Sequence, residues 1–88
     1  MGARDEDAAS RRLMRPLKRS FAIRGHRTSI SMEEPFWEAL QNAAALENST
    51  PAGLVATIDE SRGDAGLSSA VRVWILDYFR KRALPDTR

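Results

Sequence analysis

A short stretch that alternates between polar and apolar side chains, residues 24–32, most constrains how this chain can fold. In an extended strand successive side chains point to opposite faces, so residues 27–32 present two different surfaces. One face can be buried, whereas the other carries hydrogen-bonding groups. The first consists of Thr28, Ile30 and Met32, and the second consists of Arg27, Ser29 and Ser31.

Such a strand needs a partner, because a lone strand leaves backbone N–H and C=O groups unpaired along its edges. Pairing with the same strand of a second chain would produce a two-stranded ribbon. The major groove of B-form DNA is wide enough to admit such a ribbon. The polar face of this strand is therefore a candidate surface for reading DNA.

Charge is distributed unevenly along the chain although the formal net charge is only +2. Residues 8–32 contain seven basic residues and no acidic one, whereas residues 33–64 contain seven acidic residues against Arg62 alone. A basic end of this kind favours an anionic partner. We expect residues 1–17 to form a flexible basic arm, residues 18–84 a single domain, and residues 85–88 a tail.

The chain has 88 residues, no cysteine and one histidine, which excludes a disulfide or zinc staple. A core this small often needs a second subunit, so we expect oligomerisation without a metal or cofactor. The lack of cysteine fits a cytoplasmic setting. No secretory signal or membrane span is expected, and no nucleophile with a base or pair of carboxylates in an apolar setting points to an enzyme.

A second alternating stretch, residues 20–24, precedes the strand but is out of phase with it. A type II′ turn at Gly25–His26 would reset the phase and pair Ile23 with Thr28 and Phe21 with Ile30. A bulge at Gly25 within one longer strand would do the same. Periodicity does not distinguish the two, and His26 is expected to be a solvated turn residue or a phosphate contact.

Two helices follow the strand. Ser31 and Glu34 match a capping box and Pro35 suits a first turn, which predicts a helix to about Glu47. The run Asn48–Pro51 predicts a stop and a restart, because serine or threonine caps a helix that proline opens. The second helix should end near Gly63, with Gly53 allowing a close approach of backbone.

A third helix is predicted from a cap at Ser68 or Ser69 to Leu84, before Pro85. Its apolar residues cover most of its circumference, so it should be buried nearly all round. Asp77 and Lys81 have the spacing of a helical ion pair. Trp37 and Trp74 stand among aliphatic residues at helical spacing and are expected in the core.

The order of strand, capped helix, turn and helix resembles the ribbon-helix-helix superfamily of bacterial DNA-binding proteins, of the Arc and MetJ repressor type. Three stretches carry the resemblance: residues 27–34 resemble the strand running into an acidic helix start, residues 48–55 resemble the turn between the helices, and residues 19–32 resemble short bacterial members of the family. The resemblance implies a mostly helical fold with an N-terminal β-ribbon, here with an additional C-terminal helix, in an intertwined homodimer.

The resemblance also implies a binding surface for double-stranded DNA. Arg27, Ser29 and Ser31 would read base edges, because arginine can bond guanine bidentately and serine can donate or accept. Ser49 or Thr50 would hold a phosphate at the start of the second helix. Further phosphate contacts are expected from Lys18, Arg19, Arg24 and His26. The implied function is that of a sequence-specific transcriptional regulator, such as a repressor.

Two alternatives remain. Residues 66–69 also resemble the start of the family's second helix, in which case residues 49–66 are an insertion and the phosphate cap moves to Ser68. The protein could instead be a small dimeric adaptor or antitoxin whose basic arm binds an acidic protein. The third helix could cap the dimer or build a tetramer on DNA.

Overall fold

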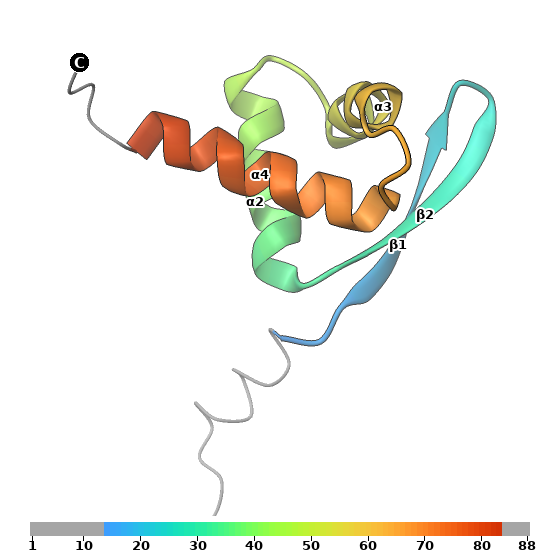
Figure 1. Ribbon diagram of the computed structural model, residues 1–88, viewed down its shortest axis with the longest axis horizontal. Coiled ribbons are helices and arrows are strands. Elements are labelled where there is room, and N and C mark those ends of the chain that lie inside the picture. Colours follow the sequence, from blue (N-terminus) through green and yellow to red (C-terminus); the bar gives the residue numbers. More distant parts are fainter. Residues whose placement is uncertain (1–13, 84–88) are drawn as a thin grey trace, which may run out of the picture.

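The computed structural model describes residues 14–83 and shows a two-stranded antiparallel hairpin followed by three helices (Figure 1). This architecture confirms the predicted fold class, a mostly helical chain with an N-terminal β-ribbon and an additional C-terminal helix. Most of the expected arm and all of the expected tail lie outside the described residues. The elements are β1 (Leu17–Ile23), β2 (His26–Met32), α2 (Glu34–Leu46), α3 (Pro51–Ser61) and α4 (Leu67–Ala83).

The hairpin is one of the two arrangements that periodicity left open, but its turn lies one residue earlier than predicted. Arg24 and Gly25 form the turn, so Ile23 pairs with His26 and Phe21 pairs with Thr28. Arg24 has φ 52° and Gly25 has φ 78°, and positive φ at both central residues is the signature of a type I′ turn. Type I′ and type II′ turns both match the right-handed twist of the strands, so the twist does not account for the shift from the expected turn at Gly25–His26.

The capping box predicted at Ser31 is wrong. Ser31 is still part of β2, where it pairs with Lys18, and α2 begins at Glu34 with Glu33 as its N-cap residue. No side chain caps this helix end. The strand pairing continues to Met32 and therefore holds Ser31 in an extended conformation, two residues before the N-cap residue Glu33.

The helix α3 has the predicted start, whereas α4 begins earlier than predicted. Thr50 caps α3, and Pro51 occupies its first turn. Neither Ser68 nor Ser69 caps α4, because Leu67 is already helical. The predicted ion pair between Asp77 and Lys81 is present at 2.9 Å.

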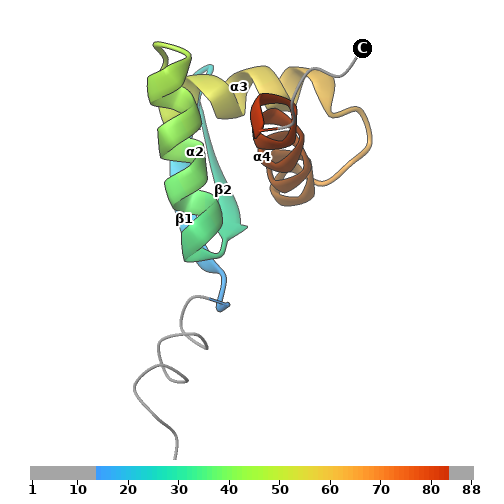
Figure 2. The ribbon, with the colours of Figure 1, turned by 90° about the vertical axis from the view of Figure 1, so that its left-hand side faces the viewer.

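The hydrophobic core lies between one face of the hairpin and the three helices, all of which stand on the same side of the hairpin (Figure 1). In Figure 2, α2 stands in front of the strands and α3 crosses near one end. Trp37 and Trp74 pack against this core, as predicted. The buried core residues are Phe21, Ile23, Ile30, Met32, Leu40, Ala43, Ala44, Leu54, Val55, Ile58, Val71 and Ile75.

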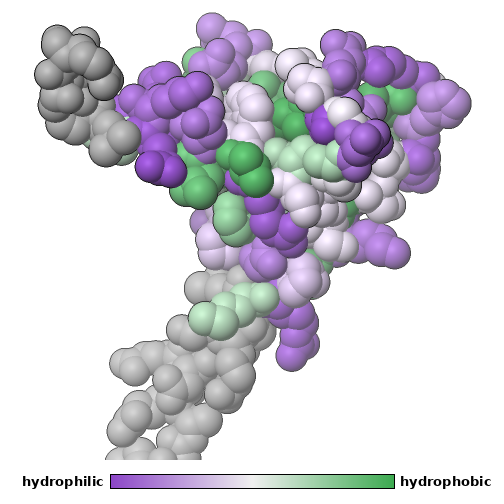
Figure 3. Space-filling view, viewed as in Figure 1, coloured by the Kyte–Doolittle hydropathy of each residue, from purple (hydrophilic) through white to green (hydrophobic). Residues whose placement is uncertain are grey.

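One face of α4 is exposed, contrary to the expectation that this helix is buried nearly all round. Val71 and Ile75 are buried, whereas Val73 is 66% exposed and Leu76 is 55% exposed. The reason is that α2, α3 and β2 cover only the inner side of α4. Figure 3 shows apolar residues scattered among hydrophilic ones on the visible face. None of the helices within residues 14–83 has the length and apolar character needed to cross a membrane.

Candidate nucleic-acid interface

The face of the hairpin that points away from the helices is polar and accessible. The register places three cross-strand pairs on this face: Lys18 with Ser31, Ser20 with Ser29, and Ala22 with Arg27. All six side chains are exposed except Ser31, which is half-buried. Lys18 and Arg27 make no ion pair with any other described residue. These six residues define the outer face. It therefore carries two positive charges without an acidic partner in the described chain, next to three serine hydroxyl groups.

The structure brings the three predicted base-contacting residues together on the outer face. Arg27, Ser29 and Ser31 follow one another along β2 with a spacing of two. The sequence prediction missed Ser20, whose Oγ lies 3.3 Å from Oγ of Ser29. The two-residue loop between the strands could have identified Ser20, because the register follows directly from the position of the turn.

Arg19 lies on the opposite face of the hairpin from Lys18 and points toward α2. Its Nη2 donates to Oε1 of Glu34 at 3.0 Å, and its guanidinium carbon lies 4.4 Å from the ring centroid of Trp37. This cation–π contact and ion pair fix Arg19 between the hairpin and the first helix. Arg19, predicted to contact phosphate, therefore does not lie on the outer face.

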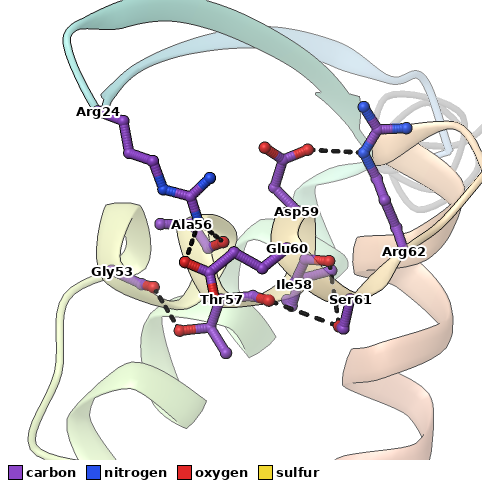
Figure 4. A network of polar contacts seen from close by, with 9 residues as sticks. All are labelled: Arg24, Gly53, Ala56, Thr57, Ile58, Asp59, Glu60, Ser61 and Arg62. Carbon is purple, nitrogen blue, oxygen red and sulfur yellow. Dashed lines mark hydrogen bonds and ion pairs between the residues drawn. The ribbon is translucent and has the colours of Figure 1, made fainter.

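Arg24, at the tip of the hairpin, reaches back to α3. Its Nη2 forms an ion pair with Glu60 and donates to the carbonyl oxygen of Ala56 at 3.4 Å (Figure 4). On the same helix, Asp59 accepts a hydrogen bond from Nε of Arg62 at 2.6 Å. The contacts of Arg24 tie the hairpin tip to α3, so this arginine is occupied, while His26 at the start of β2 is exposed.

The start of α3 contains the two predicted phosphate-binding hydroxyls. Oγ1 of Thr50 accepts a hydrogen bond from the backbone N–H of Gly53 at 3.0 Å, and Ser49 Oγ donates to the carbonyl of Thr50 at 3.4 Å. A Cβ at residue 53 would lie 2.7 Å from Oγ of Ser49, so glycine makes room for hydroxyls rather than for another backbone segment. The N–H of Ala52 has no partner within the described part of the chain.

A second set of contacts joins the C-terminal end of β2 to α4. The backbone N–H of Ser31 donates to Oγ of Ser68 at 3.0 Å, and Nη2 of Arg72 donates to the carbonyl of Ser31 at 3.1 Å. Nε of Arg72 also donates to Oε1 of Glu33 at 2.9 Å, and this hydrogen bond lowers the pKa of Glu33. Ser68, the alternative phosphate cap, is thus engaged with β2. These contacts, here called the α4 latch, were not predicted.

The chemistry of the outer face suits hydrogen bonding to nucleic acid. Arginine can bond guanine bidentately, and serine hydroxyls can both donate and accept at base edges. Exposed N–H groups at a helix start attract phosphate. Residues 14–83 contain no group of three or more potential metal ligands.

Comparison with known proteins identifies the family. The family model of a ribbon-helix-helix domain matches residues 16–79, so the chain belongs to the ribbon-helix-helix family. Its fold is similar to that of a solved structure, an uncharacterized protein from Bordetella pertussis Tohama I, at 29% sequence identity and a TM-score of 0.70. That similarity covers 88% of this chain and 68% of the other. No curated protein matches the chain.

Proposed function

We propose that this protein is a sequence-specific DNA-binding transcriptional regulator that inserts its hairpin into the major groove. The observation that carries the proposal is the outer face, where Lys18 and Arg27 lie free of acidic partners in the described chain beside exposed hydroxyls. Membership of a family of DNA-binding domains supports it. No catalytic activity is proposed, and we expect the protein to act in the cytoplasm.

The residues divide into base and phosphate contacts. Arg27, Ser29 and Ser31 would read base edges, and Lys18 and His26 would contact the flanking backbone. Base contacts carry sequence information, whereas phosphate contacts set orientation and produce salt dependence.

The helix start and the two paired arginines complete the set of phosphate contacts. Ser49 and Thr50 would hold a second phosphate through the hydroxyl of Ser49 and the N–H of Ala52. Arg19 and Arg24 can contribute only if they exchange Glu34 and Glu60 for phosphate, because both are paired in the free protein.

We further propose that the regulator acts as a homodimer. Val73 and Leu76 form an exposed apolar strip on α4, and burial of such a strip between two copies would be favourable. A tetramer on DNA would need a second surface of this kind. The same strip also favours the second candidate function, an antitoxin or adaptor in which α4 binds a different protein.

The test is selection of bound sequences from a random duplex library at two salt concentrations. A recovered motif that is lost in Arg27→Ala, with folding unchanged, would support the regulator. Retention without a motif, lost steeply as salt rises, would contradict sequence-specific reading and favour the adaptor. A Lys18→Ala variant should instead weaken binding uniformly across sequences and reduce the salt slope.

A further inference from the structure

The strand β2 has an outer edge whose backbone groups are not bonded to β1. In a hairpin with a two-residue turn, the flanking residues Ile23 and His26 form a hydrogen-bonded pair, and such pairs alternate with non-hydrogen-bonded ones along the strands. The N–H and C=O groups of Arg27, Ser29 and Ser31 therefore point away from β1. A second copy of β2 can bond to these groups, so this edge is where two chains would form a ribbon.

The α4 latch shortens the part of this edge that is available for pairing. The N–H of Ser31 is taken by Ser68 and its C=O by Arg72, in contacts that are partly buried. Figure 1 shows the start of α4 beside β2. Within the described chain, the backbone groups of Arg27 and Ser29 make no hydrogen bond on this edge, and both residues are exposed. Each chain thus offers two residues for pairing with a second copy.

The possible antiparallel registers differ in how they use these two residues. A register centred on Ser29 places Arg27 opposite the partner's Ser31, whose groups the latch holds, and registers centred on later residues need Ser31 still more. A register centred on Arg27 places the two arginines directly opposite each other, and like charges in that position destabilise a sheet. It also places Ser29 opposite the turn residue Gly25. A register centred on Thr28 places Arg27 opposite the partner's Ser29 and uses every free group of both chains.

We infer that the α4 latch sets the register of a ribbon between two chains, in which Arg27 of each chain lies opposite the partner's Ser29. The inference rests on the proposed function and deepens it, because it names the residues that the second copy contributes to the reading surface. Each half of the ribbon presents a guanidinium from one chain, suited to guanine, beside a hydroxyl from the other. The reading site for one half of a duplex is therefore incomplete in a single chain.

The hairpin extends each of these pairs into a row across the dimer. Ser20 pairs with Ser29 of the same chain, with 3.3 Å between their hydroxyls, and Ala22 pairs with Arg27. One row therefore consists of Ser20, Ser29, the partner's Arg27 and the partner's Ala22. The small side chain of Ala22 leaves Arg27 free to extend toward a duplex. Lys18 lies on the outer strand, away from the two-fold axis, which fits its proposed contact with the flanking phosphate backbone.

Thr28 lies at the two-fold axis in this register and marks it uniquely. It faces the partner's Thr28 in a non-hydrogen-bonded pair, where Cβ atoms are about 4.5–5.5 Å apart. Thr28 is half-buried in the single chain, and threonine pairs across two strands can hydrogen-bond through their hydroxyls. Arg27 and Ser29 do not face their own copies. A probe that reports which residue meets its own copy therefore distinguishes the registers.

Disulfide cross-linking of single-cysteine variants provides that probe, because the chain has no cysteine. Thr28→Cys places two thiols opposite each other, within the Cα separation of about 4.4–6.8 Å that a disulfide spans. Ser20→Cys, at an exposed serine of β1, is the matched control, since the outer strands of the dimer lie far apart. At about 10 μM protein, an effective concentration on the order of 1 mM should make Thr28→Cys oxidise on the order of 100-fold faster than this control.

The neighbouring positions give the opposite outcome if the register is wrong. Arg27→Cys and Ser29→Cys should each self-link no faster than Ser20→Cys, whereas a mixture of the two should form a mixed dimer. Fastest self-linking of Ser29→Cys or of Arg27→Cys would assign the register centred there and overturn the inference. Rates equal to that of Ser20→Cys for all three variants and their mixture would exclude a ribbon through β2. Circular dichroism and thermal unfolding establish that each variant keeps its fold.

Release of the latch tests whether it sets the register. Ser68→Ala combined with Arg72→Ala frees both groups of Ser31 and permits the longer pairing centred on Ser29. In this background we expect the two rates to reverse, so that Ser29→Cys self-links faster than a cysteine at residue 28. Ser69→Ala combined with Arg80→Ala, at exposed positions of α4, is the matched control and should leave the order of rates unchanged. An unchanged order in the latch variant would overturn the inference.

The cross-linking result is separable from the proposed function, because it needs no DNA. If the natural chain selects a motif but a different register is found, the inference fails and the regulator stands. If Thr28→Cys cross-links as expected but no motif is selected, the pairing stands and the regulator fails. If both hold, Arg27→Ala and Ser29→Ala should alter the same or adjacent base pairs of each half-site. Changes at separate base pairs would contradict a site shared between the chains.

Discussion

The two faces of the hairpin are made from the same strands, yet they treat charge in opposite ways. On the inner face, Arg19 is held by Glu34 and by the ring of Trp37, next to the buried side chains of Phe21 and Ile30. On the outer face, Lys18 and Arg27 make no ion pair within the described chain. Residues 18 and 19 are neighbours in sequence but belong to different surfaces. Basic composition alone therefore does not identify a binding residue, because half-buried arginines serve the fold.

The two faces should differ most in their contribution to stability. Ile30→Ala removes a side chain that is 1% exposed and should lower the free energy of unfolding by about 2–5 kcal/mol. Ser29→Ala, one residue away on the outer face, should change it by about 0.5 kcal/mol or less. Chemical denaturation of the two variants measures both values. Equal losses would show that the outer face is also packed, against a second chain or another part of this one.

The second-largest effect is expected in base discrimination, where an arginine of the outer face can be compared with an arginine of the inner face. Arg27→Ala should cost about 1–3 kcal/mol of discrimination at one base pair and leave the unfolding transition nearly unchanged. Arg19→Ala should lower the melting temperature, since it loses the contacts with Glu34 and Trp37, and should leave base preference unchanged. Binding isotherms on a selected and a mismatched duplex, together with melting curves, give both readouts. A reversal of the two patterns would assign the reading role to the inner face.

A smaller effect is expected at the α4 latch and depends on pH. The hydrogen bond from Arg72 lowers the pKa of Glu33 below its ordinary value of 4.5. The stabilisation is therefore fully present above that ordinary value and is lost as the pH falls through the lowered pKa. Glu33→Gln should melt at a lower temperature than the natural chain at neutral pH, and the gap should close on acidification. Glu38→Gln, at an exposed position of α2, is the control. A gap that persists in acid would mean that Glu33 acts through packing rather than charge.

The hairpin tip, where the two faces meet, should show the weakest effect. Arg24 has positive φ, and asparagine before glycine is preferred in a type I′ turn. Arg24→Asn should stabilise the hairpin by about 0.5 kcal/mol net, because the exposed ion pair with Glu60 contributes only about 0–1 kcal/mol. Glu60→Gln alone measures the ion pair. A loss in Arg24→Asn larger than that in Glu60→Gln would show that Arg24 holds the tip by more than its charge.

The sequence predicted the parts of the fold that depend on local pattern. Alternation identified β2, and the run from Ser49 to Pro51 placed the start of α3, since both signals involve neighbouring residues. The turn was placed one residue late, because glycine suits either position of a two-residue loop and both type I′ and type II′ turns match the twist of the strands. The capping box at Ser31 failed because strand pairing competes for the same residue. Ser68 and Arg72 lie too far from Ser31 in sequence for periodicity to reveal the latch.

For the candidate site too, the sequence predicted the placement of residues that follows from local pattern and missed the placement that depends on distant contacts. The side-chain alternation in β2 was sufficient to place Arg27, Ser29 and Ser31 on one face. Ser20 was missed because its position depends on the register with β1. The paired states of Arg19 and Arg24 depend on Glu34 and Glu60, which become neighbours only after the helices dock. Charge counting along the chain treats all these arginines alike.

The α4 latch also bears on the order of events during protein synthesis. The hairpin contains only local contacts and can form early, whereas Ser68 and Arg72 follow Ser31 by 37 and 41 residues. The outer edge of β2 therefore stays uncovered on the ribosome until most of the chain has been made. Unpaired strand edges in incomplete chains are prone to aggregate. A nascent chain stalled before α4 should associate with other chains, and completion of that helix ends the period of risk.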